Sequence, residues 1–287
     1  MAPSLFLLAV VVYIPMLVAF YVSFTGLNQY TIGDWEHTPF VGLLHYFAIL
    51  APSGALFDSL VSSVRASVLF SVLTTLFITP IGVGAALLLN ERFRGRGLMR
   101  ALALLPYIIP TFVNALIWRL VFMNGTGLAD QLLAALHLGS RQTFWLIGPN
   151  SLWAMVIADV WASWPFIYLM ALAALQTIPA DLYDAAIVDG AGRMHRFLHV
   201  TLPLMRSTLG LALVLSTINH FNNFTLPFVM FGNSPPDQVD VLPVSIYVNS
   251  FVTFNFGLGA AMSVVALAIM LTPAVIYLRA AHVGDSD

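Results

Sequence analysis

The chain has 287 residues, of which 60% are hydrophobic and only 8% are charged, with a mean hydropathy of +0.90. A soluble core could not shield that much apolar surface, so the composition indicates a membrane protein. A formal net charge of −2 excludes the concentrated basic face that a nucleic-acid partner requires. All the basic residues are arginines, so a lysine-dependent nucleotide-binding loop is absent and any ATP that drives this protein must be bound by another chain.

Apolar runs of about 20 residues, the length that crosses a bilayer as helix, recur along the chain. They predict an all-α integral membrane protein that forms a single transmembrane domain over residues 1–287. The first run has no basic region before it, so we expect a retained helix and not a signal peptide. Its abrupt start at Met1 suggests that a short cytoplasmic tail is missing from the sequence. The six predicted spans are 4–24, 66–89, 101–122, 151–175, 207–230 and 257–279.

The arginines predict the orientation of these spans. Four of them lie in the loop 91–100, which should therefore be cytoplasmic. An even number of crossings then places both termini in the cytoplasm. On this topology, eight arginines are cytoplasmic, at positions 92, 94, 96, 100, 193, 196, 206 and 279, and three are at or beyond the outer ends, at positions 65, 119 and 141.

Three spans have polar or aromatic residues at i, i+4, i+7 spacing, which places each set on one helix face. We expect these faces to converge on an aqueous cavity that binds a solute. The alternative is that the same side chains hydrogen-bond neighbouring helices, at about 1 kcal/mol each. The candidate substrate-binding residues are Tyr107, Thr111 and Asn114 in the third span, Asp159, Ser163 and Phe166 in the fourth, and Ser216, Asn219, His220 and Asn223 in the fifth.

Asp159 is the strongest of these candidates, because an ionised carboxylate facing lipid costs several kcal/mol. It should therefore face a cavity or a partner. Hydroxyls, amides and aromatic rings suit a polyhydroxylated ligand. A carboxylate would bind hydroxyls, would bind an amino-sugar cation better, and would disfavour an anion unless His220 or an arginine offset it. We interpret Arg119, near the outer end of its span, as an interfacial anchor.

The loop 176–206, between the fourth and fifth spans, has the signals of two short helices and a turn. Pro179 suits a first helical position, and the pair of glycines at 190 and 192 suits a sharp turn. His195 and His199 are spaced i, i+4 and could supply half of a metal site. Arg196 stands where a zinc protease would need a glutamate, so we expect no metal there.

This loop resembles that of the binding-protein-dependent ABC importer permeases, which reads E-A-A, three residues, G, nine residues, I-x-L-P. Asp184-Ala185-Ala186, Gly190 and Val200-Thr201-Leu202-Pro203 match at that spacing, with Asp for Glu and Val for Ile. The resemblance implies that the loop is a coupling helix docked in a groove of a separate ATPase, and that Gly190 lets the backbone turn where a Cβ would clash. The residues implied in coupling are Asp184, Ala185, Ala186, Asp189, Gly190, Ala191, Leu202 and Pro203.

Further segments are similar to the carbohydrate branch of that family, which includes the larger membrane subunit of the maltose importer. They are Leu105-Pro106-Tyr107 with Pro110, 161–165, and Phe221-Asn222-Asn223-Phe224. The resemblance implies a permease subunit that passes a sugar or sugar-like solute, an amino sugar included, across the bacterial cytoplasmic membrane by alternating access. It also implies a sugar site at the positions of the candidate substrate-binding residues. The implied partners are a second permease, two copies of an ATPase that binds ATP and Mg, and an extracytoplasmic solute-binding protein, with no cofactor on this chain.

Three alternatives remain at this point. A permease of the same superfamily could carry a non-sugar solute such as a glycerophosphodiester. An intramembrane enzyme would need a pair of buried carboxylates or a metal motif, and only Asp159 lies deep in a span. A channel or scaffold would have no ATPase partner.

Overall fold

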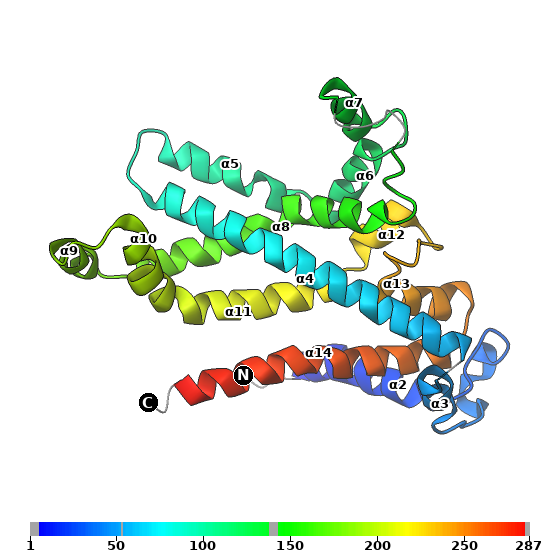
Figure 1. Cartoon of the computed structure of the whole chain (residues 1–287). Helices are drawn as coiled ribbons and strands as arrows, with labels where there is room; N and C mark the ends of the chain where they lie inside the picture. The colour runs from blue at the N-terminus through cyan, green and yellow to red at the C-terminus, as the bar shows by residue number, and fades with distance from the viewer. Residues whose placement is uncertain (1–5, 53, 138–142, 285–287) are drawn as a thin grey trace.

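The computed structural model describes residues 6–52, 54–137 and 143–284, and within these ranges the regular secondary structure is helical, with one isolated bridge between Thr25 and Phe40 (Figure 1). The all-α prediction is confirmed for this part of the chain. The helices are η1 (Ala9–Tyr13), α2 (Ile14–Val22), η2 (Ile32–His37), α3 (Leu44–Leu50), α4 (Ala55–Asn90), α5 (Arg96–Ile108), α6 (Thr111–Val121), α7 (Leu128–Ala135), α8 (Asn150–Gln176), α9 (Ala180–Val188), α10 (Arg193–Arg196), η3 (Phe197–Thr201), α11 (Leu202–Phe221), α12 (Thr225–Phe231), α13 (Leu242–Tyr247), η4 (Val248–Val252) and α14 (Phe256–Gly284).

Length and composition identify three helices that could cross a membrane, or four if α5 and α6 count as one bent span. α8 matches the predicted fourth span closely, whereas α4 begins at Ala55, eleven residues before the predicted 66. The third long stretch, Arg193–Phe231, contains the predicted fifth span. Shorter apolar helices at Phe6–Val22 and Phe256–Thr272 occupy the predicted first and sixth spans, while residues 4 and 5 lie outside the described part.

The predicted third span is not one helix. α5 ends at Ile108 and α6 begins at Thr111, and the two helices are bent by 86°. Both residues between them are extended, with ψ of 127° at Ile109 and 136° at Pro110. A proline disfavours the helical conformation in the residue before it, which accounts for the break. Tyr107 therefore does not share a helix face with Thr111 and Asn114, contrary to the expectation from spacing.

The predicted fifth span is also interrupted, because α11 ends at Phe221 and α12 begins at Thr225. Asn223 lies in this interruption and not on the helix that carries Ser216 and His220. The i, i+4, i+7 spacing predicts that Ser216, His220 and Asn223 lie on one continuous helix face. That prediction is therefore wrong for Asn223.

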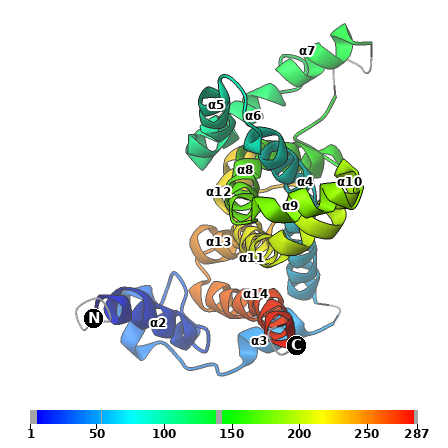
Figure 2. The same ribbon diagram turned by 90° about the vertical axis from the view of Figure 1, so that its left-hand side faces the viewer.

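α4 and α8 pack side by side at the centre of the molecule, and α11 packs against both (Figures 1 and 2). A Cβ at Gly82 would lie 2.7 Å from the Cβ of Ile167, so only glycine permits this approach of α4 to α8. α14 packs against α11 on one side and α2 on the other. The short helices that follow the two breaks, α6 and α12, pack against each other.

The loop between α4 and α5, the helices α9 and α10, and the last turns of α14 all lie at one end of the molecule, opposite α3, α7 and α13 (Figure 1). At the first end, the guanidinium of Arg100 donates two hydrogen bonds to the carbonyl of Leu89, at 3.1 and 2.9 Å. The predicted cytoplasmic arginines of both loops thus share one end. Arg141, predicted on the outer side, lies outside the described residues.

Buried serines of α4 hold the segment that leads into α13. The backbone N–H of Leu242 donates to Ser67 Oγ at 2.7 Å, and Ser63 Oγ donates to Asp240 at 3.3 Å. Burial raises the pKa of the Asp240 carboxyl from 3.8 to about 6; the hydrogen bond from Ser63 opposes this shift and the charge of Asp237 adds to it.

Because the folded chain binds this proton more tightly than the unfolded chain, Asp240 should make stability fall as the pH rises from 3.8 to about 6. Asp240→Asn removes this titration, so the variant should gain thermal stability relative to the native chain as the pH rises through that interval. Melting temperatures of the detergent-solubilised protein across the interval measure the difference. Glu36→Gln, at an exposed carboxylate, is the control. A constant difference between Asp240→Asn and the native chain would contradict the prediction.

Candidate functional site

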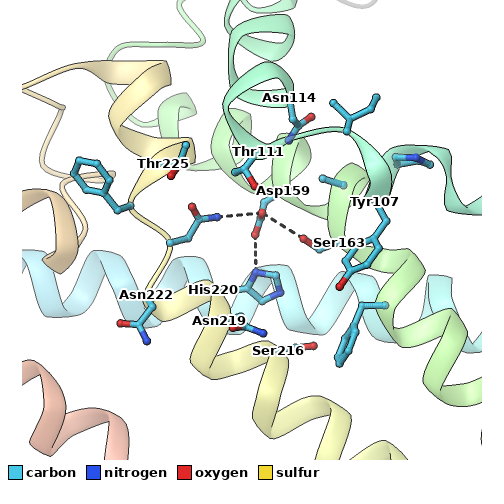
Figure 3. Close-up of a pocket in the computed structure, with 16 residues that line it drawn as sticks. Tyr107, Thr111, Asn114, Asp159, Ser163, Ser216, Asn219, His220, Asn222 and Thr225 are labelled. Atoms are coloured by element: carbon cyan, nitrogen blue, oxygen red, sulfur yellow. Dashed lines mark hydrogen bonds and ion pairs between the residues drawn. The ribbon is translucent and has the colours of Figure 1, made fainter. Parts of the chain in front are cut away.

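A cavity of about 400 Å³ lies beside the breaks in the two interrupted spans (Figure 3). This volume is within the range of about 300–1,000 Å³ that is usual for small-molecule sites. All the candidate substrate-binding residues line it. The lining residues are Pro106, Tyr107, Ile109, Thr111, Asn114, Asp159, Ala162, Ser163, Phe166, Ser216, Asn219, His220, Asn222, Asn223, Phe224 and Thr225.

The two breaks bring these residues together. The end of α5 and the start of α6 supply one wall, and the end of α11 with the segment 222–224 supplies the facing wall. The continuous helix α8 supplies the third wall, with Asp159, Ser163 and Phe166 at helical spacing as expected. Side chains from distant parts of the sequence therefore point into a single space (Figure 3).

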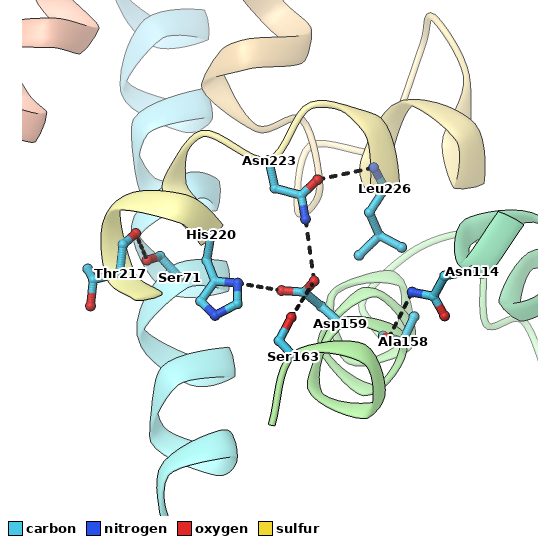
Figure 4. Close-up of polar contacts among 9 residues, drawn as sticks. All are labelled: Ser71, Asn114, Ala158, Asp159, Ser163, Thr217, His220, Asn223 and Leu226. Atoms are coloured by element: carbon cyan, nitrogen blue, oxygen red, sulfur yellow. Dashed lines mark hydrogen bonds and ion pairs between the residues drawn. The ribbon is translucent and has the colours of Figure 1, made fainter. Parts of the chain in front are cut away.

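The centre of the site is an ion pair between α8 and α11. Nδ1 of His220 lies 2.7 Å from Oδ2 of Asp159, and both side chains are almost fully buried. The other carboxylate oxygen, Oδ1, accepts from Ser163 Oγ and Asn223 Nδ2, each at 3.4 Å (Figure 4). A buried carboxylate needs such a partner because its desolvation costs several kcal/mol.

Asn223 links the ion pair to the next helix. Its Nδ2 donates to Asp159, and its Oδ1 accepts from the backbone N–H of Leu226 at 3.2 Å. One side chain thereby satisfies a buried carboxylate and a free N–H at the start of α12. The interruption at 222–224 is therefore held in a defined conformation.

Three buried polar atoms of the cavity lining have no hydrogen-bond partner among the described residues, and one of them, Oδ2 of Asp159, has only the ion-pair contact with His220. Asn114 donates through Nδ2 to the carbonyl of Ala158 at 3.3 Å, which leaves its Oδ1 without a partner. His220 uses Nδ1 for the ion pair, which leaves its Nε2 without a partner. Buried polar atoms are seldom left unsatisfied, so a ligand with hydroxyl groups would complete these last two.

At the arginine-rich end of the molecule, α9 carries Asp184, Ala185 and Ala186. Its end is a Schellman motif, in which the N–H of Ala191 bonds the carbonyl of Ala186 and the N–H of Gly190 bonds that of Ile187. Gly190 has a φ of +75°, and a Cβ there would meet nothing within 4 Å. Within this chain, the need for glycine is therefore the left-handed backbone and not the expected steric clash.

The surface of this loop is exposed and partly apolar. Val188 is 87% exposed and Ile187 is 53% exposed, although both belong to a short helix at the end of the molecule. The phenol of Tyr183 lies 3.1 Å from Thr201 Oγ1, which links α9 to η3 just before Leu202 and Pro203. The described residues contain no group of three or more metal-ligating side chains, and the rings of His195 and His199 stack on each other 4.0 Å apart.

Comparison with known proteins identifies the family. Residues 78–283 match the family described as "Binding-protein-dependent transport system inner membrane component". The trehalose/maltose transport system permease protein MalF of Thermococcus litoralis is 34% identical over 96% of this chain and 90% of its own length. The sulfoquinovosyl glycerol transport system permease protein SmoG of Agrobacterium fabrum is 31% identical over 99% of this chain and 90% of its own length.

The chain belongs to this family of transport permeases. It is a membrane subunit of an ABC importer, located in the inner membrane, and not an enzyme. A bacterial ABC transporter that imports the acidic polysaccharide alginate has the same fold, with a TM-score of 0.79 and 22% identity over 96% of this chain and 93% of that one. The MetNI methionine transporter is more distant, with a TM-score of 0.60 and 15% identity over 80% of this chain and 98% of that one.

Part of the permease cavity is not predicted by the spacing of polar residues. Pro106, Ile109, Ala162, Asn222 and Thr225 also line it, as does Phe224. The prolines at 106 and 110 and the paired asparagines at 222 and 223 are the available signals of irregular backbone. Arg119 is not simply an anchor that reaches the interface, because its Nη1 donates to the carbonyl of Val229 in α12 at 3.0 Å.

The ion pair should show strong energetic coupling. His220→Leu leaves the buried Asp159 charge uncompensated and should lower the free energy of unfolding by about 3–5 kcal/mol. Asp159→Leu combined with His220→Leu removes both polar groups and should cost less than the two single substitutions added together, by about 1–3 kcal/mol. Thermal or denaturant unfolding of the purified permease and its three variants measures this cycle. Additive effects would mean that the 2.7 Å contact contributes no coupling.

Proposed function

We propose that this permease passes a sugar or sugar-like solute into the cytoplasm by alternating access, powered by ATP that is bound with Mg on separate subunits. The observation that carries the proposal is the cavity, where residues from three predicted spans meet around the Asp159–His220 pair. The relatives named for trehalose/maltose and for sulfoquinovosyl glycerol support the carbohydrate class. The proposed carbohydrate class includes amino sugars.

The chemistry of the lining supports a saccharide. Hydroxyl and amide groups can exchange hydrogen bonds with sugar hydroxyls, each of which both donates and accepts. Tyr107, Phe166 and Phe224 offer aromatic rings for the apolar faces of a sugar ring. A glycerophosphodiester is the second candidate, but among the described lining residues there is no arginine to pair with its phosphate.

The proposed topology is a single domain of six spans, with α2 and α14 as the first and last and both termini cytoplasmic. The common position of the α4–α5 loop, α9, α10 and the end of α14 supports it (Figure 1). The excess of arginine in those segments agrees with the positive-inside tendency.

The proposed coupling element is α9, docked in a groove of the ATPase. Its support is the match of residues 184–203 to the family loop, together with the exposed apolar side chains of Ile187 and Val188. The proposed complex has a second permease, two ATPase subunits and an extracytoplasmic solute-binding protein. A related alginate transporter has been solved in complex with its alginate pentasaccharide-bound periplasmic protein.

Tyr107→Ala tests the sugar cavity. Tyr107 is 50% exposed, so its loss should not unfold the permease, but it removes a ring from the cavity. Weaker stacking should raise the concentration of trehalose or maltose for half-maximal uptake roughly three- to tenfold. ATP-dependent uptake into proteoliposomes containing the complete importer measures the change. Tyr21→Ala, at a 53% exposed tyrosine of α2, is the matched control. Equal uptake by the two variants would argue against a sugar site at Tyr107.

Gly190→Val tests the coupling role of α9. Valine strongly resists the φ of +75° at this position, so the end of α9 should be remodelled while the membrane helices remain folded. We expect normal membrane insertion and a loss of uptake of tenfold or more. Gly192→Val is the matched control, because Gly192 has φ of −67° and open space around its Cβ position. Normal uptake with Gly190→Val at normal expression would overturn the coupling proposal.

A further inference from the structure

We propose that the cavity selects an uncharged saccharide over cationic and anionic ones, because His220 already compensates the charge of Asp159. This inference rests on the proposed function and narrows its substrate class. The carboxylate of Asp159, viewed alone in the sequence, favours an amino sugar. The contacts of both its oxygens lead to a different conclusion.

Few charged groups face the cavity. Among the described residues that line it, the only side chains that are charged in the ordinary pH range are Asp159 and His220. Arg119, farther along α6, is not part of the lining and donates to the carbonyl of Val229. An anionic sugar would therefore meet a carboxylate with no arginine to bind it.

A cationic sugar would meet a carboxylate with neighbours at both oxygens, although only Oδ1 accepts hydrogen bonds from the described residues. Oδ2 of Asp159 faces the imidazole of His220 at 2.7 Å, and Oδ1 already accepts from Ser163 and Asn223. An ammonium group could reach Oδ1 only by displacing Ser163 or Asn223, and could reach Oδ2 only from beside the imidazole of His220. The pair thus removes the advantage that a free carboxylate would give to an amino sugar.

Three buried atoms of the lining have no hydrogen bond from the described residues, and Oδ2 of Asp159 is the one of them that has an ion-pair contact, with His220. The other two, Nε2 of His220 and Oδ1 of Asn114, have no hydrogen-bond partner in the described part of the chain. The imidazole Nε2 accepts when the ring is neutral and donates when it is protonated. A hydroxyl group can pair with it in either state and can also donate to the amide oxygen of Asn114. An ammonium group only donates and a carboxylate only accepts, so neither matches both atoms in all states.

Binding of defined disaccharides tests the charge selectivity directly. The probes are maltose and trehalose, the disaccharide of glucosamine with its amines protonated, and digalacturonate. Saturation-transfer NMR on the assembled permease and ATPase subunits, without the solute-binding protein, measures binding to the membrane site. We expect the neutral disaccharides to bind at least tenfold more tightly than either charged one. Equal or tighter binding of a charged disaccharide overturns this inference alone, whereas binding of no saccharide overturns the proposed function as well.

Substitutions at the ion pair test whether the ion pair is the cause of the charge selectivity. His220→Gln leaves the charge of Asp159 uncompensated, so the affinity for the glucosamine disaccharide relative to maltose should rise about tenfold. Asp159→Asn combined with His220→Gln removes both charges and should restore the preference for maltose. An unchanged preference in folded His220→Gln would show that the pair does not set selectivity. If that variant does not fold, the native protein with the same four disaccharides decides the question.

Discussion

The backbone of a chain in hydrocarbon must satisfy its own hydrogen bonds. This constraint determines where the backbone of the permease can depart from helical structure. Helices meet the constraint everywhere except at their ends. The interruptions at 109–110 and 222–224 both adjoin the polar cavity, where side chains and a solute can replace the missing backbone partners. Asn223 is an example of such a replacement, since its side-chain amide oxygen accepts a hydrogen bond from the backbone N–H of Leu226. The site and the breaks in the helices therefore depend on each other.

A buried carboxylate in such a bundle is expensive, and the permease offsets the cost with a group from another helix. The Asp159–His220 contact links α8 to the end of α11 directly beside the interruption. The amide of Asn223 and the hydroxyl of Ser163 share the remaining carboxylate oxygen. An imidazole is smaller and less permanently charged than a guanidinium, so the same pair can stabilise the bundle while leaving the cavity open and close to neutral.

Much of this arrangement follows from local sequence. Apolar runs locate the main helices, and the cost of a charge in lipid is enough to identify Asp159 as a cavity residue. The helix breaks are harder to predict, because Pro80, Pro106 and Pro165 lie inside helices while Pro110 separates two. Local sequence does not distinguish these prolines, since neighbouring helices decide which freed backbone groups can be satisfied. Nor could spacing indicate that Asp159 pairs with His220, because that contact depends on how two distant helices pack.

The close contact at Gly82 has a mechanical consequence. Because Gly82 has no side chain, the backbone of α4 contacts Ile167 of α8 directly, and the two helices should move together as a stiff lever. Asp159 lies on α8 about 25 Å from its end at Gln176, which is separated from α9 by only three residues. A displacement applied at α9 would thus reach the carboxylate through unbroken helix. The two walls formed by the interrupted spans have no such continuity and can yield, so the same displacement would change the shape of the cavity and not merely its position.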